Sequence, residues 1–138
     1  MMTNPTNRNT ILWADDDADD LQMMQEVLQE SKEDVRIIEA ANGAEVISIL
    51  YSDGEPLPCL VVLDINMPVL NGKETLALLK KDTRFSSIPV VMFSTSSSEK
   101  DLAFCRQFGV EIFVKPCSYT GLKQVISKLL NYCGPAFN

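Results

Sequence analysis

Carboxylate, hydroxyl and amine side chains stand directly after short apolar runs of the sequence. These residues are Asp15 and Asp16 after residues 10–14, Asp64 after 59–63, Ser94 after 88–93 and Lys115 after 112–114. Crowded carboxylates repel one another and raise one another's pKa unless a cation lies among them. A ligand set made of oxygen atoms favours a hard cation such as Mg²⁺, with Mn²⁺ as a substitute. Lys115 would add a second positive charge, so the group could hold one metal ion and one further anion.

The surrounding pattern predicts the elements that bring these side chains together. Short apolar runs alternate with amphipathic segments five times along the chain. The strands are expected near 10–14, 35–40, 59–63, 88–93 and 112–114, and the helices near 21–28, 44–50, 71–81, 99–108 and 122–130. This order predicts an α/β fold, a three-layer sandwich with a five-stranded parallel sheet and five helices. The carboxyl ends of parallel strands meet at one edge of the sheet, where ligands bind.

Composition excludes several classes of protein. The 138 residues carry 19 Asp and Glu against 12 Lys and Arg, a net charge of −7, and include no His. The acidic balance disfavours nucleic acid and anionic membrane surfaces as partners. The lack of His argues against His-dependent catalytic triads and most zinc sites.

The sequence also predicts a cytoplasmic location. It has no apolar run long enough for membrane insertion, and its polar N-terminus does not look like a secretory signal. Cys59, Cys105, Cys117 and Cys133 lack CxxC spacing, so all four are expected to be reduced, with Cys59 and Cys105 acting as small core residues. Residues 1–9 are expected to form a flexible tail, 10–132 one domain, and 133–138 a short tail with no output domain.

Four motifs together resemble a known family. They are Asp15-Asp16, the stretch 64–72 with the sequence DINMPVLNG, Ser94-Thr95, and Lys115-Pro116. Their order, each at the end of its own strand, resembles the response-regulator receiver domain over about residues 10–131. The resemblance implies a flavodoxin-like fold with strand order 2-1-3-4-5, and a stand-alone receiver in two-component signalling.

The resemblance also implies roles for the acidic residues. Asp64 would be the phosphoacceptor. Asp16 and Asp64 would bind Mg²⁺ directly, Asp15 would act through water, and the backbone carbonyl of Asn66 would complete the protein ligands. Asp17, Asp19 and Asp20 lie further along the start of a helix, where Asp is common in any protein, and are assigned to capping and solubility.

The remaining implied roles concern the last two strands. Lys115 would pair with Asp64 before transfer and with a phosphoryl oxygen after it, aimed inward by a cis bond to Pro116. Ser94 would donate its hydroxyl group to the phosphoryl group. Receivers usually carry an aromatic residue three positions before the lysine, where this chain has Ile112. Phe113 should point to the other face of the sheet, so coupling through an aromatic switch is in question.

The function implied is to accept a phosphoryl group from a sensor histidine kinase or a histidine phosphotransfer protein, and to signal by changing the binding of a downstream protein. The chain would be a monomer or weak dimer. It would not be an enzyme, apart from its own Mg²⁺-dependent phosphorylation and slow dephosphorylation. The alternative is a phosphorylation-independent interaction module on the same fold. A phosphohydrolase with an Asp nucleophile is disfavoured, because it needs a second Asp where this chain has Asn66.

Overall fold

A computed structural model describes residues 6–30, 35–52, 57–95 and 98–133 of the chain. The strands are β1 (Thr6–Ala14), β2 (Arg36–Ala40), β3 (Leu57–Asp64), β4 (Val90–Ser94) and β5 (Glu111–Val114). The helices are α1 (Ala18–Glu30), α2 (Gly43–Leu50), α3 (Gly72–Lys81), α4 (Glu99–Phe108) and α5 (Tyr119–Leu130).

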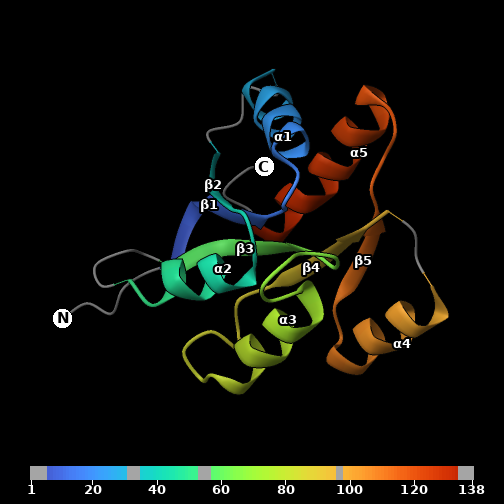
Figure 1. The fold of residues 1–138 in the computed structure, drawn as a ribbon. Coiled ribbons are helices and arrows are strands. Elements are labelled where there is room, and N and C mark those ends of the chain that lie inside the picture. The colour runs from blue at the N-terminus through green and yellow to red at the C-terminus, as the bar shows by residue number, and fades with distance from the viewer. Residues whose placement is uncertain (1–5, 31–34, 53–56, 96–97, 134–138) are drawn as a thin grey trace.

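The strands form one parallel sheet in the order β2-β1-β3-β4-β5. Helices α1 and α5 cover one face of the sheet, and α2, α3 and α4 cover the other (Figure 1). The predicted three-layer α/β sandwich and its flavodoxin-like strand order are therefore confirmed. Strands β1 and β3 are neighbours at the centre, so their carboxyl ends lie side by side.

Successive side chains of the central strands supply two separate cores. Trp13 of β1 packs with Val27 of α1 and Leu129 of α5 on one face. Leu63 of β3 packs with Leu76 of α3 on the other face. Alternation along each strand produces this division, since neighbouring side chains point to opposite faces. The buried framework fixes the strand ends at which the polar side chains stand.

The N-terminal boundary differs from the prediction. Strand β1 begins at Thr6 rather than Thr10, and Thr6 and Asn7 pair with Leu57 and Pro58 of β3. Residues 6–9 therefore belong to the sheet and not to a tail. Their polar sequence gave no strand signal, because the pairing depends on backbone groups and not on apolar side chains. The remainder of the predicted tail, residues 1–5, lies outside the described residues.

The expectation of four reduced cysteines is wrong for one pair. Cys59 of β3 and Cys133, just after α5, form a disulfide in the core beneath α1 and α5. The two residues are 74 positions apart, and their spacing in the sequence carries no pairing signal. Cys105 is buried as expected, and Cys117 is exposed. Because disulfides are typical of oxidising compartments, cysteine usage no longer supports a cytoplasmic location.

Reduction of this disulfide is expected to destabilise the protein. The cross-link closes a long loop between residues 74 positions apart, and in the chain-entropy model such a bridge contributes about 4 kcal/mol. We expect a reductant to lower the Tm by about 10 °C. Thermal unfolding followed by circular dichroism, with and without reductant, measures the effect. Cys133→Ala should melt at the lower temperature in both conditions, and Cys117→Ser should behave like the wild type. Equal Tm values for the oxidised and reduced wild type would contradict this role.

Among the described residues, no helix is both long enough and apolar enough to cross a lipid bilayer.

Candidate functional site

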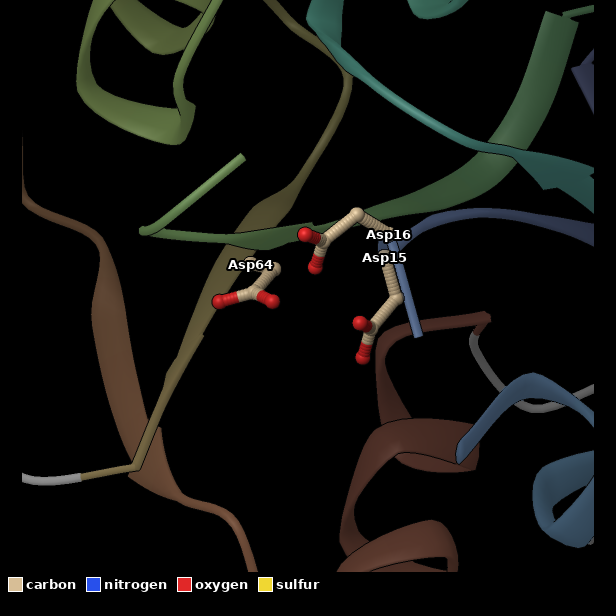
Figure 2. A group of neighbouring side chains, drawn as sticks. All are labelled: Asp15, Asp16 and Asp64. Carbon is tan, nitrogen blue, oxygen red and sulfur yellow. The ribbon is translucent and has the colours of Figure 1, made fainter. Parts of the chain in front are cut away.

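Three carboxylates meet where the two central strands end. Asp15 and Asp16 follow β1, and Asp64 is the last residue of β3. Each offers one oxygen atom, and these oxygens all lie within 4.8 Å of one another. Figure 2 shows the three carboxyl groups turned toward a common space. Asp15 and Asp64 are buried, whereas Asp16 is exposed to solvent.

Lys115 lies directly after β5 and reaches this cluster. Its Nζ atom is 2.9 Å from Oδ2 of Asp15 and 3.0 Å from Oδ2 of Asp64. The expected pairing of Lys115 with Asp64 is therefore present. The expected cis bond is not, because the Lys115–Pro116 peptide is trans. The backbone N–H of Lys115 donates to the carbonyl of Ser94 at 2.7 Å, which holds the lysine beside the end of β4.

Burial and charge shift the pKa values of Asp15 and Lys115. Burial of the Asp15 side chain raises its pKa to about 6, and the negative charge of Asp64 adds to that rise. The N–H of Asp17 and the ammonium of Lys115 act in the opposite direction. Burial alone would lower the pKa of Lys115, but its hydrogen bonds to three carboxylates outweigh burial and raise the pKa above the ordinary lysine value. The site therefore holds a firmly protonated amine against an Asp15 carboxylate whose charged form burial disfavours.

Ser94 and Asn66 are the two remaining residues with expected roles at the site. Ser94 is the last residue of β4 and is buried, and β4 pairs with β3 beside Asp64. The N-cap of α4 is Ser98, so Ser94 is not used as the cap. Asn66 is exposed in the loop after β3, and its backbone N–H donates to Oδ1 of Asp64 at 3.2 Å. The metal-ligand role of the Asn66 carbonyl remains a prediction.

The loop between β3 and α3 is fixed by local interactions. Asn71 and Glu74 form a reciprocal capping box at the start of α3. Gly72 packs so closely against the backbone of Asp64 and Ile65 that a Cβ atom there would overlap it. Its N–H also donates to the carbonyl of Ile65 at 3.0 Å. These contacts keep the start of α3 directly against the end of β3 and so fix the backbone that carries Asp64.

The side chains of β5 alternate as the sequence predicts. Phe113 stacks on Phe93, with ring centroids 5.7 Å apart, on the face covered by α1 and α5. Ile112 packs on the opposite face. The usual switch position thus holds an aliphatic side chain, and the neighbouring aromatic residue points to the other side of the sheet.

One acidic residue lies within the site although the sequence pattern predicts it to lie outside. Asp17 caps α1 as predicted, because its Oδ1 accepts the N–H of Asp19 at 2.9 Å. Asp20, however, lies 3.1 Å from Nζ of Lys115 through its Oδ2 atom, so its assignment to capping and solubility alone is wrong. No sequence signal separates Asp20 from Asp19. Both stand in the first turn of α1, and only the orientation of the helix selects between them.

The donor set fits a small divalent cation. It consists of carboxylate oxygens, two of them from buried residues whose charges repel each other. Mg²⁺ prefers such oxygen ligands, keeps several water molecules and takes only one or two carboxylates. Asp16 and Asp64 would hold the ion, and the exposed position of Asp16 leaves room for its water ligands.

The raised pKa of Asp15 predicts how metal-free stability depends on pH. The folded-state pKa is about 6, against an ordinary value of 3.8. The folded protein therefore binds more protons between these values, and its stability falls as the pH rises from about 4 to about 6. Ionised Asp15 costs about 3 kcal/mol on this basis. This cost already includes the favourable pairing of Asp15 with Lys115, so we expect Asp15→Asn to raise the Tm by roughly 8 °C at pH 7 in EDTA.

Thermal melts of the wild type and Asp15→Asn between pH 4 and 8 check this prediction. The difference in Tm should shrink toward the acidic end, where Asp15 is protonated. Asp16→Asn, a change to an exposed neighbour, is the matched control and should show no comparable gain. An Asp15→Asn variant that is less stable than the wild type at pH 7 would contradict the assignment.

The fold and the acidic site together define a receiver of two-component signalling. The chain matches the model of the response regulator receiver domain over residues 11–127. It therefore belongs to the response regulator receiver family, as the four motifs predict.

Individual relatives agree with this assignment. The chain is 33% identical over 108 residues to response regulator Rcp1 of Synechocystis sp., a match that covers 75% of this chain and 74% of Rcp1. The crystal structure of the phosphorylated cyanobacterial phytochrome response regulator RcpA superposes with a TM-score of 0.82 at 26% identity, covering 94% of this chain and 96% of RcpA. The Mn²⁺-bound form of Rcp1 superposes with a TM-score of 0.80 at 29% identity, covering 88% and 94% of the two chains.

Proposed function

We propose that this receiver domain accepts one phosphoryl group on Asp64 in a Mg²⁺-dependent reaction. The observation that best supports this is the position of the Asp64 carboxylate. One of its oxygens lies within 4.8 Å of an oxygen of Asp15 and of Asp16, and its Oδ2 atom lies 3.0 Å from the ammonium of Lys115. A nucleophilic carboxylate beside both a cation site and an amine is suited to phosphoryl transfer, in which positioning and charge neutralisation supply most of the catalysis.

Each residue of the site would have its own role in the phosphoryl transfer. A carboxylate oxygen of Asp64 would form a bond to phosphorus while the bond from phosphorus to the donor's leaving group breaks. Lys115 would hold a phosphoryl oxygen, and the hydroxyl group of Ser94 would donate to another. Asp16 and Asp64 would hold Mg²⁺, with Asp15 acting through a water molecule. The bound ion would neutralise charge on the phosphoryl oxygens.

The physiological donor in this proposal is a sensor histidine kinase or a histidine phosphotransfer protein, because receiver domains take phosphoryl groups from such proteins. The phosphorylated chain would then signal by altered binding of a downstream protein. The phosphorylated state of RcpA and the Mn²⁺ bound to Rcp1 support both parts of the chemistry for this chain by similarity. The reaction adds and slowly loses one phosphoryl group, so the protein would not act as a multiple-turnover enzyme on a separate substrate.

The alternative of a phosphorylation-independent interaction module would be favoured by loss of the acceptor, an acidic partner or the lysine. Asp15, Asp16, Asp64 and Lys115 are all present and grouped together, which favours the phosphoacceptor.

Incubation with acetyl phosphate tests the proposal without a cognate kinase. Intact-mass spectrometry should detect the addition of one phosphoryl group in the presence of Mg²⁺ and none in EDTA. Circular dichroism in both buffers serves as a control that the fold is kept. An unchanged mass in Mg²⁺, under conditions that phosphorylate a known receiver, would overturn the proposal.

A further inference from the structure

Lys115 has a third carboxylate partner, which comes from a helix and not from a strand end. Its Nζ atom lies 2.9 Å from Asp15, 3.0 Å from Asp64 and 3.1 Å from Asp20. We propose that Asp20 is a positioning residue that competes with the incoming phosphoryl group for the ammonium of Lys115. This inference rests on the proposed function, because it concerns the same phosphoryl site.

The number of donors on the lysine makes the competition direct. An ammonium group has three N–H donors, and the three carboxylates match that number. A phosphoryl oxygen can therefore gain a full hydrogen bond from Lys115 only when one carboxylate gives up its own. Asp64, as the acceptor, passes its bond with Lys115 to a phosphoryl oxygen on transfer. Asp15 and Asp20 are then the two carboxylates that draw the ammonium away from the phosphoryl group.

Exposure identifies Asp20 as the partner of Lys115 that is displaced more easily than Asp15. The side chain of Asp15 is 2% exposed, and its Oδ1 atom also accepts the N–H of Asp17 at 2.9 Å. The side chain of Asp20 is 38% exposed. Water can replace Lys115 at Asp20 at little cost, whereas the same replacement at Asp15 would leave a buried charge without its partner. Of these two pairs, the one between Lys115 and Asp20 should therefore break more easily when the ammonium moves toward the phosphoryl group.

The pair of Asp20 and Lys115 lies where its charges can change the affinity of the site for a ligand. Asp20 and Lys115 line a small cavity between α1 and α5, whose walls also include Met24, Phe93 and Leu122. The apolar walls of this cavity reduce the screening of charge by water. The charge of Asp20 therefore interacts with groups in the site more strongly than the charge of a fully solvated residue would.

Removal of this charge should affect the two ligands in opposite directions. Without Asp20, a phosphoryl group no longer competes with that carboxylate for Lys115 and should bind more tightly. A divalent cation, in contrast, loses an attractive negative charge and faces a lysine bound more closely to Asp15 and Asp64, so it should bind more weakly. A partly exposed ion pair changes affinity by about two- to fivefold. General destabilisation of the fold would weaken both ligands and could not produce opposite signs.

The experiment compares Asp20→Asn with Asp19→Asn in the full chain. Asp19 is a matched control, because it lies in the same helical turn, is exposed and loses the same charge. NMR titration gives the Kd for Mg²⁺ alone, and then the Kd for beryllium trifluoride, a phosphoryl analogue, at saturating Mg²⁺. For Asp20→Asn we expect roughly threefold weaker Mg²⁺ binding and roughly threefold tighter binding of the analogue. Asp19→Asn should stay close to the wild type in both titrations.

Two results would overturn the inference. One is an Asp20→Asn variant that matches Asp19→Asn, and the other is a change of both affinities in the same direction. If the wild type binds no beryllium trifluoride at all, the proposed function itself fails. A wild type that binds the analogue, together with an unresponsive Asp20→Asn, removes only the role of Asp20.

Discussion

Asp64→Asn is expected to abolish phosphorylation by acetyl phosphate, with a loss of at least about a hundredfold in rate. The amide has nearly the shape of the carboxylate, so it can still accept the N–H of Asn66, which lies 3.2 Å from Oδ1 of Asp64. It offers no anionic oxygen to attack phosphorus. Because Lys115 keeps Asp15 and Asp20 as partners, the fold should be retained.

Intact-mass measurement after incubation with acetyl phosphate and Mg²⁺ gives the phosphorylated fraction over time. Asp19→Asn removes one negative charge without touching Lys115, and it should be phosphorylated at a rate close to that of the wild type. A folded Asp64→Asn protein that still gains one phosphoryl group would show that a different residue is the acceptor.

The second large effect concerns the metal ion. Asp16→Ala is expected to weaken Mg²⁺ binding at least about tenfold, because Mg²⁺ takes only one or two carboxylates from a protein and Asp16 would be one of them. Asp16 is exposed, whereas Asp15 and Asp64 are buried, so its loss should remove the ligand without opening the core. Phosphorylation at a fixed, subsaturating Mg²⁺ concentration should fall in parallel and recover partly at high Mg²⁺.

A titration of Mg²⁺ followed by NMR measures the affinity directly. Asp17→Ser is the matched control, because it removes the neighbouring negative charge while Ser can still cap α1. An Asp16→Ala variant that binds Mg²⁺ as tightly as Asp17→Ser would rule out Asp16 as a direct ligand.

Most of the fold follows from local signals in the sequence. The spacing of apolar residues predicts the five strands and five helices, and α4 ends where expected. Gly109 follows it with a φ of 67°, the left-handed conformation that favours glycine after a helix. The convergence of Asp15, Asp64 and Lys115 was also predictable, because parallel strands bring their carboxyl ends to one edge.

The features that could not be predicted depend on distant contacts. The Cys59–Cys133 disulfide forms only because the end of α5 packs beside the start of β3, 74 positions away in the sequence. The first residues of β1 are polar and gain their place by backbone pairing with β3. Neither interaction produces a periodic pattern of residues in the sequence from which it could be predicted.

Asp20 illustrates the same limit within the site. A helix that starts after an acidic pair attracts Asp for electrostatic reasons, so Asp19 and Asp20 look equivalent in the sequence. The rotation of α1 on the sheet directs only Asp20 toward Lys115. Its role becomes visible only when the packing of α1 against the strand ends is known.

Reductive trapping of the phosphorylated protein tests the central claim most directly. Borohydride converts an aspartyl phosphate into homoserine, and peptide mass spectrometry then locates the modified residue. After incubation with acetyl phosphate and Mg²⁺, we expect homoserine at position 64 and unmodified aspartate at positions 15, 16 and 20. Homoserine at any of those three positions instead, or its absence from a protein whose intact mass shows one added phosphoryl group, would contradict the assignment of Asp64 as the phosphoacceptor.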